Sequence, residues 1–161
     1  MLPEILREIP VARALESWDP SAIVDGATAL GEAVLYIAPE KIRDVCRQLR
    51  TEHGFARLGG ITGVDWYPAS PRFEIVYFLH SIGNNERLRL KCRVAEGQEL
   101  DSVTGVWRAA NWYEREIYDL FGITFRGHPD LRRIMLPEDW EGHPLRKDFP
   151  VHGHRYSYKD E

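Results

Sequence analysis

Apolar and charged side chains alternate most regularly between Arg87 and Val94. The apolar positions are Leu88, Leu90, Cys92 and Val94, and the positions between them hold Arg87, Arg89, Lys91 and Arg93. This period of two predicts a β-strand with one face in the core and a stripe of cations on the other. The stripe fits three interpretations: a solvated face, a docking surface for an acidic partner, or a face paired with acidic residues of the chain itself.

Three further segments have strand character: Ala33–Ala38, Leu58–Trp66 and Arg72–His80. In the last, Phe73, Ile75, Tyr77 and Leu79 fall on one face. Glycines 59, 60 and 63 indicate a bulge or close packing in the second. Residues 68–71 and 83–85 have turn composition, so the strands beside them are expected to be antiparallel neighbours.

Helical spacing predicts two longer helices. The first begins at Pro39, which suits the first helical position, and ends before Gly54. Its apolar stripe contains Ile42, Val45, Cys46 and Leu49. The second runs from about residue 101 to Phe121, with a break near Gly105, and ends at Gly122. Its apolar side contains Ala110, Tyr113, Ile117, Leu120 and Phe121.

The opposite side of the second helix has an unusual composition. Trp112, Arg115 and Asp119 share it, and the spacing of the last two predicts an i,i+4 ion pair. A large indole away from the core should be covered, either by the tail of the chain or by another protein.

The two ends of the chain differ from the middle. Residues 1–32 are expected to form short amphipathic helices around Pro10, and residues 33–122 an α+β core. Residues 123–161, which we call the tail, are interrupted by Pro129, Pro137, Pro144 and Pro150 but carry regularly spaced apolar residues. An extended segment of this kind should lie across a surface, partly of its own domain and partly of a neighbour. The predicted fold is thus α+β: a small, mostly antiparallel sheet packed on one face by helices, followed by a long extended tail.

Composition narrows the functional classes. The net charge is −4, which disfavours a general nucleic-acid binder. Cys46 and Cys92 are far apart and form no CxxC pair, so thiolates of this chain cannot hold an iron–sulfur cluster or a structural zinc. No apolar run approaches the length of a membrane span, so membrane association is expected only through a partner.

A complete catalytic constellation is not evident. Glu114 and Glu116 point to different sides of a helix, and a buried Glu114 would need a partner, for which a basic side chain of the sheet or tail is the obvious choice. His128, His143, His152 and His154 lie in the tail near Asp130, Asp139 and Asp148, a set that a metal-dependent hydrolase could use. Their spacing fits turn capping and interface hydrogen bonds better than metal ligation.

The helix and the tail together resemble a known family. The run from Trp107 to Ile123, WRAANWYEREIYDLFGI, is similar to the hallmark of the C subunit of respiratory complex I, the NADH:quinone oxidoreductase. The segments 125–134, FRGHPDLRRI, and 137–150, PEDWEGHPLRKDFP, continue the likeness. A looser similarity extends back through the strands and the helix at 39–53.

This resemblance implies a peripheral-arm subunit without a redox cofactor of its own. NADH, flavin, iron–sulfur clusters and quinone would be bound by other subunits, and the complex would couple electron transfer to proton pumping. The implied partners are chiefly the D subunit and also the B and I subunits, on the cytoplasmic side of the bacterial cell membrane. A homologous scaffold subunit of a membrane-bound hydrogenase or of another quinone-linked dehydrogenase is the alternative.

We expect the partner interface to lie on the second helix and the tail, partly through inter-subunit or tail-to-domain ion pairs. Its candidate residues are Trp112, Arg115, Asp119, His128, Asp130, Arg132, Arg133, Trp140, His143, Arg146, Lys147 and Asp148. No catalytic, cofactor-binding or metal-binding residue is expected in the chain.

Overall fold

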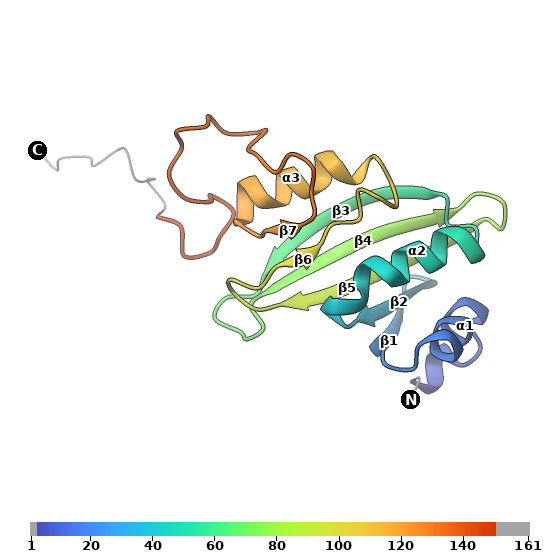
Figure 1. Cartoon of the computed structure of the whole chain (residues 1–161). Coiled ribbons are helices and arrows are strands. Elements are labelled where there is room, and N and C mark those ends of the chain that lie inside the picture. The colour runs from blue at the N-terminus through green and yellow to red at the C-terminus, as the bar shows by residue number, and fades with distance from the viewer. Residues whose placement is uncertain (1–2, 151–161) are drawn as a thin grey trace, which may run out of the picture.

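A computed structural model describes residues 3–150 of the chain (Figure 1). Its elements in order are η1 Glu4–Leu6, α1 Pro10–Trp18, β1 Ile23–Ala29, β2 Glu32–Ile37, η2 Pro39–Lys41, α2 Ile42–Glu52, β3 Arg57–Asp65, β4 Phe73–Ser81, β5 Glu86–Val94, β6 Leu100–Asp101, α3 Ala110–Phe121 and β7 Phe125–Arg126. Within these residues no helix is long and apolar enough to cross a membrane.

Five strands form the main sheet, in the order β1-β2-β5-β4-β3. Among the described strands of this sheet, the β2–β5 pair is parallel and the other neighbours are antiparallel. The short β6 and β7 form a separate parallel pair. The predicted α+β class with a mostly antiparallel sheet is confirmed, and the four predicted strands lie within one or two residues of the observed β2–β5.

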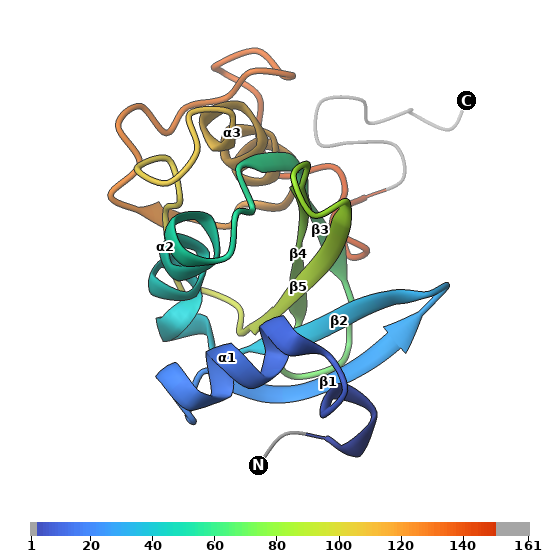
Figure 2. The same ribbon diagram turned by 90° about the vertical axis from the view of Figure 1, so that its right-hand side faces the viewer.

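Helices α2 and α3 cover one face of strands β3–β5 (Figure 2). The predicted stripe of α2 is completely buried, and Ala110, Ile117 and Phe121 of α3 are buried as well. Phe121 contacts Phe73 edge to face, with ring centroids 6.5 Å apart. Gly63 leaves space for this ring, since a Cβ there would lie 3.0 Å from the Phe121 side chain. The expected close packing is therefore confirmed at Gly63, and the expected bulge is confirmed by a shift in the β3–β4 register between Leu58 and Gly60.

Two expectations for the secondary structure were wrong. The short helices expected around Pro10 are present as η1 and α1, but the helical segment does not extend to residue 32, because β1 pairs with β2 and extends the sheet to a new edge. The second long helix begins at Ala110 instead of near residue 101. Residues 102–103 are irregular backbone, in which the Ser102 hydroxyl and the Val103 N–H both contact Glu114.

The cationic stripe of β5 lies on the helix-free face of the sheet, where acidic residues of the chain itself pair with it. Glu32 of β2 lies 3.2 Å from Arg89, and Glu74 of β4 lies 3.0 Å from Lys91. The same two carboxylates also contact Arg87 and Arg93 at 3.8 and 3.5 Å. Of the three interpretations, pairing within the chain thus accounts for part of the stripe.

Substitution of Gly122 by alanine should lower the stability of the chain by about 2 kcal/mol or more. Gly122 ends α3 with φ +76°, which favours glycine, and a Cβ there would lie 2.6 Å from the His143 ring. Gly31→Ala is the matched control, because its φ is +79° with open space around the Cβ. Urea unfolding of both variants separates the clash from the backbone strain; equal losses would show that the His143 contact is unimportant.

Candidate partner-binding surface of helix α3 and the tail

The tail folds back over the C-terminal end of α3 (Figure 1). The last turn of a helix leaves carbonyl groups without a helical partner, and here the tail supplies the donors. Arg133 and His143 Nδ1 donate to the Asp119 carbonyl oxygen at 3.1 and 2.8 Å, the Leu145 N–H to that of Leu120 at 3.0 Å, and Arg146 Nε to that of Phe121 at 2.9 Å. The last carbonyl groups of α3 therefore find their hydrogen-bond donors in the tail, and the donors of the tail find their acceptors at the helix end.

Asp119 is the centre of this junction and has no exposed surface. One carboxylate oxygen accepts Arg133 Nη1 at 2.7 Å. The other accepts three consecutive backbone N–H groups, of Ile134, Met135 and Leu136, at 2.7–3.1 Å. Burial raises the pKa of Asp119, but these hydrogen bonds outweigh it and the net direction is downward. A charged Asp119 thus fixes the path of residues 133–136.

Two arginines complete the junction by donating to carbonyl groups. Arg133 Nη2 lies 3.0 Å from the Trp140 oxygen and 2.9 Å from the Gly142 oxygen. Arg115 Nε lies 3.1 Å from the carbonyl oxygen of Arg132. The predicted i,i+4 ion pair between Arg115 and Asp119 was wrong, because Asp119 pairs with Arg133. Helical spacing brings two side chains near each other but does not exclude better partners from a distant segment.

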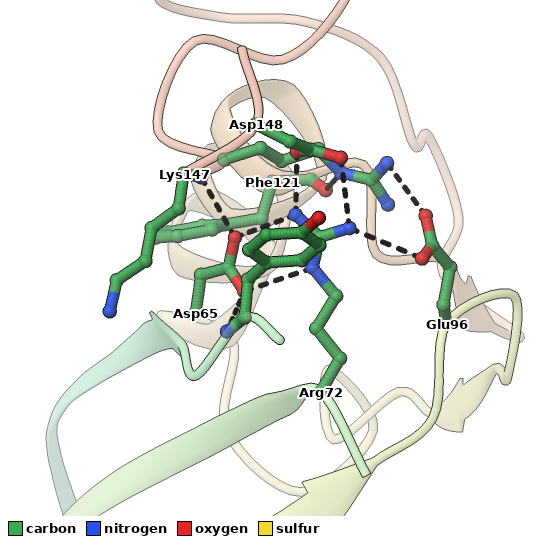
Figure 3. A network of polar contacts seen from close by, with 8 residues as sticks. Asp65, Arg72, Glu96, Phe121, Lys147 and Asp148 are labelled. Carbon is green, nitrogen blue, oxygen red and sulfur yellow. Dashed lines mark hydrogen bonds and ion pairs between the residues drawn. The ribbon is translucent and has the colours of Figure 1, made fainter. Parts of the chain in front are cut away.

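A second network fastens the far end of the described tail to the sheet (Figure 3). Its centre is Arg72, which is 5% exposed and immediately precedes β4. Arg72 makes a two-pronged contact with Asp65, at 2.9 and 2.8 Å, and reaches Asp148 at 2.6 Å and Glu96 at 3.2 Å. Hydrogen bonds from Arg72 hold the pKa of the Asp65 carboxyl far below its usual value. The same arginine lowers the pKa of Asp148.

The tail also contributes donors to this second network. The backbone N–H of Lys147 donates to Asp65 at 2.9 Å. Arg146 pairs with Glu96 at 2.9 Å and stacks over the Phe73 ring at 5.2 Å. The expected tail-to-domain ion pairs are confirmed for Arg133, Arg146 and Asp148. The sequence did not reveal Arg72 as the centre of the second network, where it pairs with Asp65, Glu96 and Asp148. The one signal for it was an arginine placed between a turn and an apolar strand.

Glu114 of α3 is fully buried on the other side of the helix. Its carboxyl oxygens lie 2.7 Å from the Val103 nitrogen and 2.6 Å from Ser102 Oγ. Burial raises the pKa of Glu114 to about 7, against the opposing effect of these two hydrogen bonds. A basic side chain of the tail does approach, as expected, since His128 Nε2 is 3.9 Å away. The hydrogen bonds to the Glu114 carboxyl, however, are donated by two neutral groups, the Ser102 hydroxyl and the Val103 N–H.

The buried Glu114 carboxyl should make the stability of the chain fall as pH rises from 4.5 to about 7. In this window the folded state keeps a proton that the unfolded state has lost, so rising pH favours unfolding, by on the order of 3 kcal/mol in total. Glu114→Gln keeps the shape and removes the titration, so its urea midpoint should change less between pH 5 and pH 8. Glu116→Gln on the same helix is the control, and equal pH dependence of all three proteins would contradict the assignment.

The described histidines of the tail are engaged by backbone groups. His128 Nδ1 accepts the Asp130 N–H at 3.0 Å, so its Nε2 carries the proton and donates to the Asn111 carbonyl at 3.1 Å. Burial lowers the pKa of His143, helped by the charges of Arg133 and Arg146. Within residues 3–150, no group of three or more His, Cys, Asp or Glu side chains could hold a metal. His152 and His154 lie outside the described residues.

Residues 35–155 match the sequence profile of the family described as respiratory-chain NADH dehydrogenase, 30 Kd subunit. The chain belongs to this family. It is 53% identical over 142 residues to the NADH-quinone oxidoreductase C subunit 2 of Rhizobium etli, covering 86% of this chain and 73% of that protein. It is 48% identical over 134 residues to the C subunit of Geotalea uraniireducens, covering 83% and 82%. The resemblance found in the sequence is confirmed.

Two solved structures extend the family likeness to the fold. A trypsin-resistant fragment of Nqo5 is 32% identical with a TM-score of 0.65, covering 75% of this chain and 98% of the fragment. A chain of the membrane-bound sulfane sulfur reductase, an archaeal respiratory membrane complex, is 27% identical with a TM-score of 0.74, covering 88% and 84%. Both solved chains therefore share the fold of this chain over the parts that align.

The candidate interface residues of this family member differ in exposure. Arg115 and Asp119 are buried under the tail, and the partly buried ones are His128, Arg133, Trp140, His143 and Arg146. The exposed ones are Trp112, Asp130, Arg132, Lys147 and Asp148. Trp112 is 62% exposed, with the Arg115 guanidinium 5.0 Å from its ring centre. The tail therefore leaves most of this indole uncovered, and the role of these residues in a partner interface stays a prediction.

Proposed function

We propose that the chain is a non-catalytic structural subunit of a proton-translocating NADH:quinone oxidoreductase. In this role it docks onto the quinone-reducing and iron–sulfur subunits of the peripheral arm, on the cytoplasmic side of a bacterial membrane. The D subunit is its chief partner, and the B and I subunits also contact it. NADH, flavin, iron–sulfur clusters and quinone are bound by those other subunits. The relatives named as C subunits of NADH-quinone oxidoreductase support the parent complex.

One observation carries the structural role. In the α3–tail junction and in the Arg72 network, the central charged and imidazole groups are bound to the backbone or to one another. Asp119 holds three amides, His143 and Arg146 hold helix carbonyls, and Arg72 is surrounded by carboxylates. Groups held in this way stabilise a shape, and a fixed shape is what a scaffold subunit needs.

The decisive experiment isolates the complex through an affinity tag on this chain in its natural host. The D, B and I subunits should be recovered in equal amounts, and the preparation should reduce quinone with NADH. Deletion of the chain should abolish quinone reduction while leaving NADH oxidation by a soluble artificial acceptor in the membrane extract. Recovery of the chain alone, or retention of quinone reduction without it, would contradict the proposal.

Trp112 offers a sharper test of where a partner contacts the chain. Because this indole is largely exposed, Trp112→Ala should leave the urea midpoint of the chain nearly unchanged. Loss of a buried aromatic anchor at an interface commonly costs about 2 kcal/mol or more, so recovery of the D subunit with the chain should fall roughly 30-fold under dilute conditions. Trp18→Ala, 42% exposed at the end of α1, is the control. Unchanged recovery of the D subunit would remove Trp112 from the interface.

The sulfane sulfur reductase likeness favours a second candidate, a scaffold subunit of a different membrane-bound respiratory complex. A membrane-bound hydrogenase or another quinone-linked dehydrogenase belongs to this class. The tagged complex distinguishes the candidates by its electron donor, because only the first oxidises NADH. A metal-dependent hydrolase using the tail histidines is the most remote alternative, and stoichiometric zinc lost on His128→Ala or His143→Ala would favour it.

A further inference from the structure

The helix-free face of the sheet carries more positive than negative charge. Strand register places five cations on it, Arg57, Arg87, Arg89, Lys91 and Arg93. The carboxylates that register places on the same face of the described sheet are Asp25, Glu32 and Glu74. This excess contrasts with the net charge of −4 for the whole chain. The positive charge is therefore concentrated locally instead of being a general property of the surface.

One end of this face has a row of basic side chains on adjacent strands. Arg57 of β3 is directly opposite His80 of β4, and His80 is directly opposite Arg87 of β5. Arg57 and Arg87 therefore flank His80 on the same face, and both guanidinium groups would attract an anion placed between them. Arg87 is 3.8 Å from Glu32, whereas Arg57 has no ion-pair partner among residues 3–150. The row is thus incompletely neutralised by the chain.

A hollow lies against this row and has unused hydrogen-bonding capacity. Its volume is about 210 Å³, and its lining includes Arg57, His80, Arg87, Glu32 and Phe78. His80 Nε2 is buried and finds no hydrogen-bond partner in the described part of the chain. A buried polar atom of this kind normally has a partner. A carboxylate entering the hollow would provide an acceptor for a histidine N–H and an anion for the two arginines.

Aromatic rings beside the cations give the face a second kind of contact. Phe78 and Trp66 are 37% and 44% exposed. The guanidinium of Arg89 lies 5.2 Å from the Phe78 ring centre, and that of Arg93 lies 5.5 Å from the Trp66 ring centre. Aromatic and arginine side chains are the residues most enriched where proteins bind one another.

We propose that this face, centred on Arg57, His80 and Arg87, binds an acidic polypeptide segment of another subunit of the complex, separately from the α3–tail surface. The inference rests on the proposed structural role, because it names a second surface through which the chain would be held. A protein partner is favoured over a nucleic acid because Glu32 and Glu74 lie between the cations, where they would repel a continuous phosphate backbone.

Zero-length carbodiimide cross-linking of the intact purified complex tests the proposal directly. Arg57→Lys keeps the charge and supplies an amine, so the substituted side chain should become joined to an Asp or Glu of another subunit, identified by mass spectrometry. Arg47→Lys is the control, because Arg47 on α2 is 3.5 Å from Asp44 and should link within the chain. Cross-links from position 57 confined to this chain, or none, would overturn the proposal.

Charge reversal provides the second measurement. The double variant Arg57→Glu, Arg87→Glu should reduce the fraction of chain recovered in the complex on the order of tenfold, equivalent to about 1.4 kcal/mol. Arg47→Glu should leave it unchanged. Recovery of bound RNA or DNA with the wild-type complex and its loss from the double variant would overturn the assignment to a protein. If the wild-type chain does not co-purify with other subunits at all, the proposed function fails. If the wild-type chain co-purifies and the double variant is recovered equally well, this inference alone fails.

Discussion

Replacement of Asp119 by alanine is expected to lower the free energy of unfolding by about 3–5 kcal/mol, the usual loss when one partner of a buried ion pair is removed. Asp119 is fully buried, and its carboxylate holds Arg133 and three consecutive amides. Without it, those amides and most of the Arg133 guanidinium remain inside the junction with fewer acceptors. Urea unfolding at pH 7 measures the loss directly.

A matched control separates this effect from the loss of any carboxylate. Asp130→Ala removes an ion pair with Arg132 in which both side chains are more than half exposed, and it should cost less than about 1 kcal/mol. A double-mutant cycle of Asp119→Ala with Arg133→Met then isolates the pair, since contacting residues in one network are not additive. If Asp119→Ala costs no more than Asp130→Ala, the junction is not held by this carboxylate.

The sequence predicted the elements whose apolar period is long and regular. The apolar face of β5 was predicted from Leu88 and Leu90, and the stripe of α2 from Ile42 and Val45. All four side chains are buried as expected. Strand β1 was missed because Asp25, Gly26 and Thr28 interrupt any apolar alternation. It lies at the sheet edge, and its glycine is explained by Leu6, which packs where a Cβ would be. A long-range contact of this kind leaves no local pattern.

The sequence predicted that the tail contacts its own domain, but not which side chains pair with one another there. The sequence indicated that the tail lies across its own domain, and Asp119 with Arg133 confirms this. It could not indicate that Asp119 would bind amides 15–17 positions away instead of Arg115 at helical spacing. Arg72 was missed for the same reason, because its carboxylates come from positions 65, 96 and 148. Only the folded chain brings these groups together.

Substitution of Arg72 by methionine is expected to destabilise the chain by about 3–5 kcal/mol at pH 7 and to release the end of the tail. Methionine fills much of the same space but leaves Asp65, which is 4% exposed, with a charge that only backbone amides oppose. Asp148 loses its partner at the same time. Trypsin should therefore cut at Arg146 and Lys147 faster than in the wild-type chain.

The effect of Arg72→Met should also depend on pH in a defined direction. Because the folded-state pKa of Asp65 is depressed, its stabilising contribution is present above its ordinary value of about 3.9 and is lost as pH falls below it. The stability difference between wild type and variant should accordingly shrink between pH 5 and pH 2. Arg47→Met removes an exposed arginine of α2 and should show a small difference at every pH. A difference for Arg72→Met that stays constant into acid would mean that lost packing, and not the unpaired Asp65 charge, causes the destabilisation.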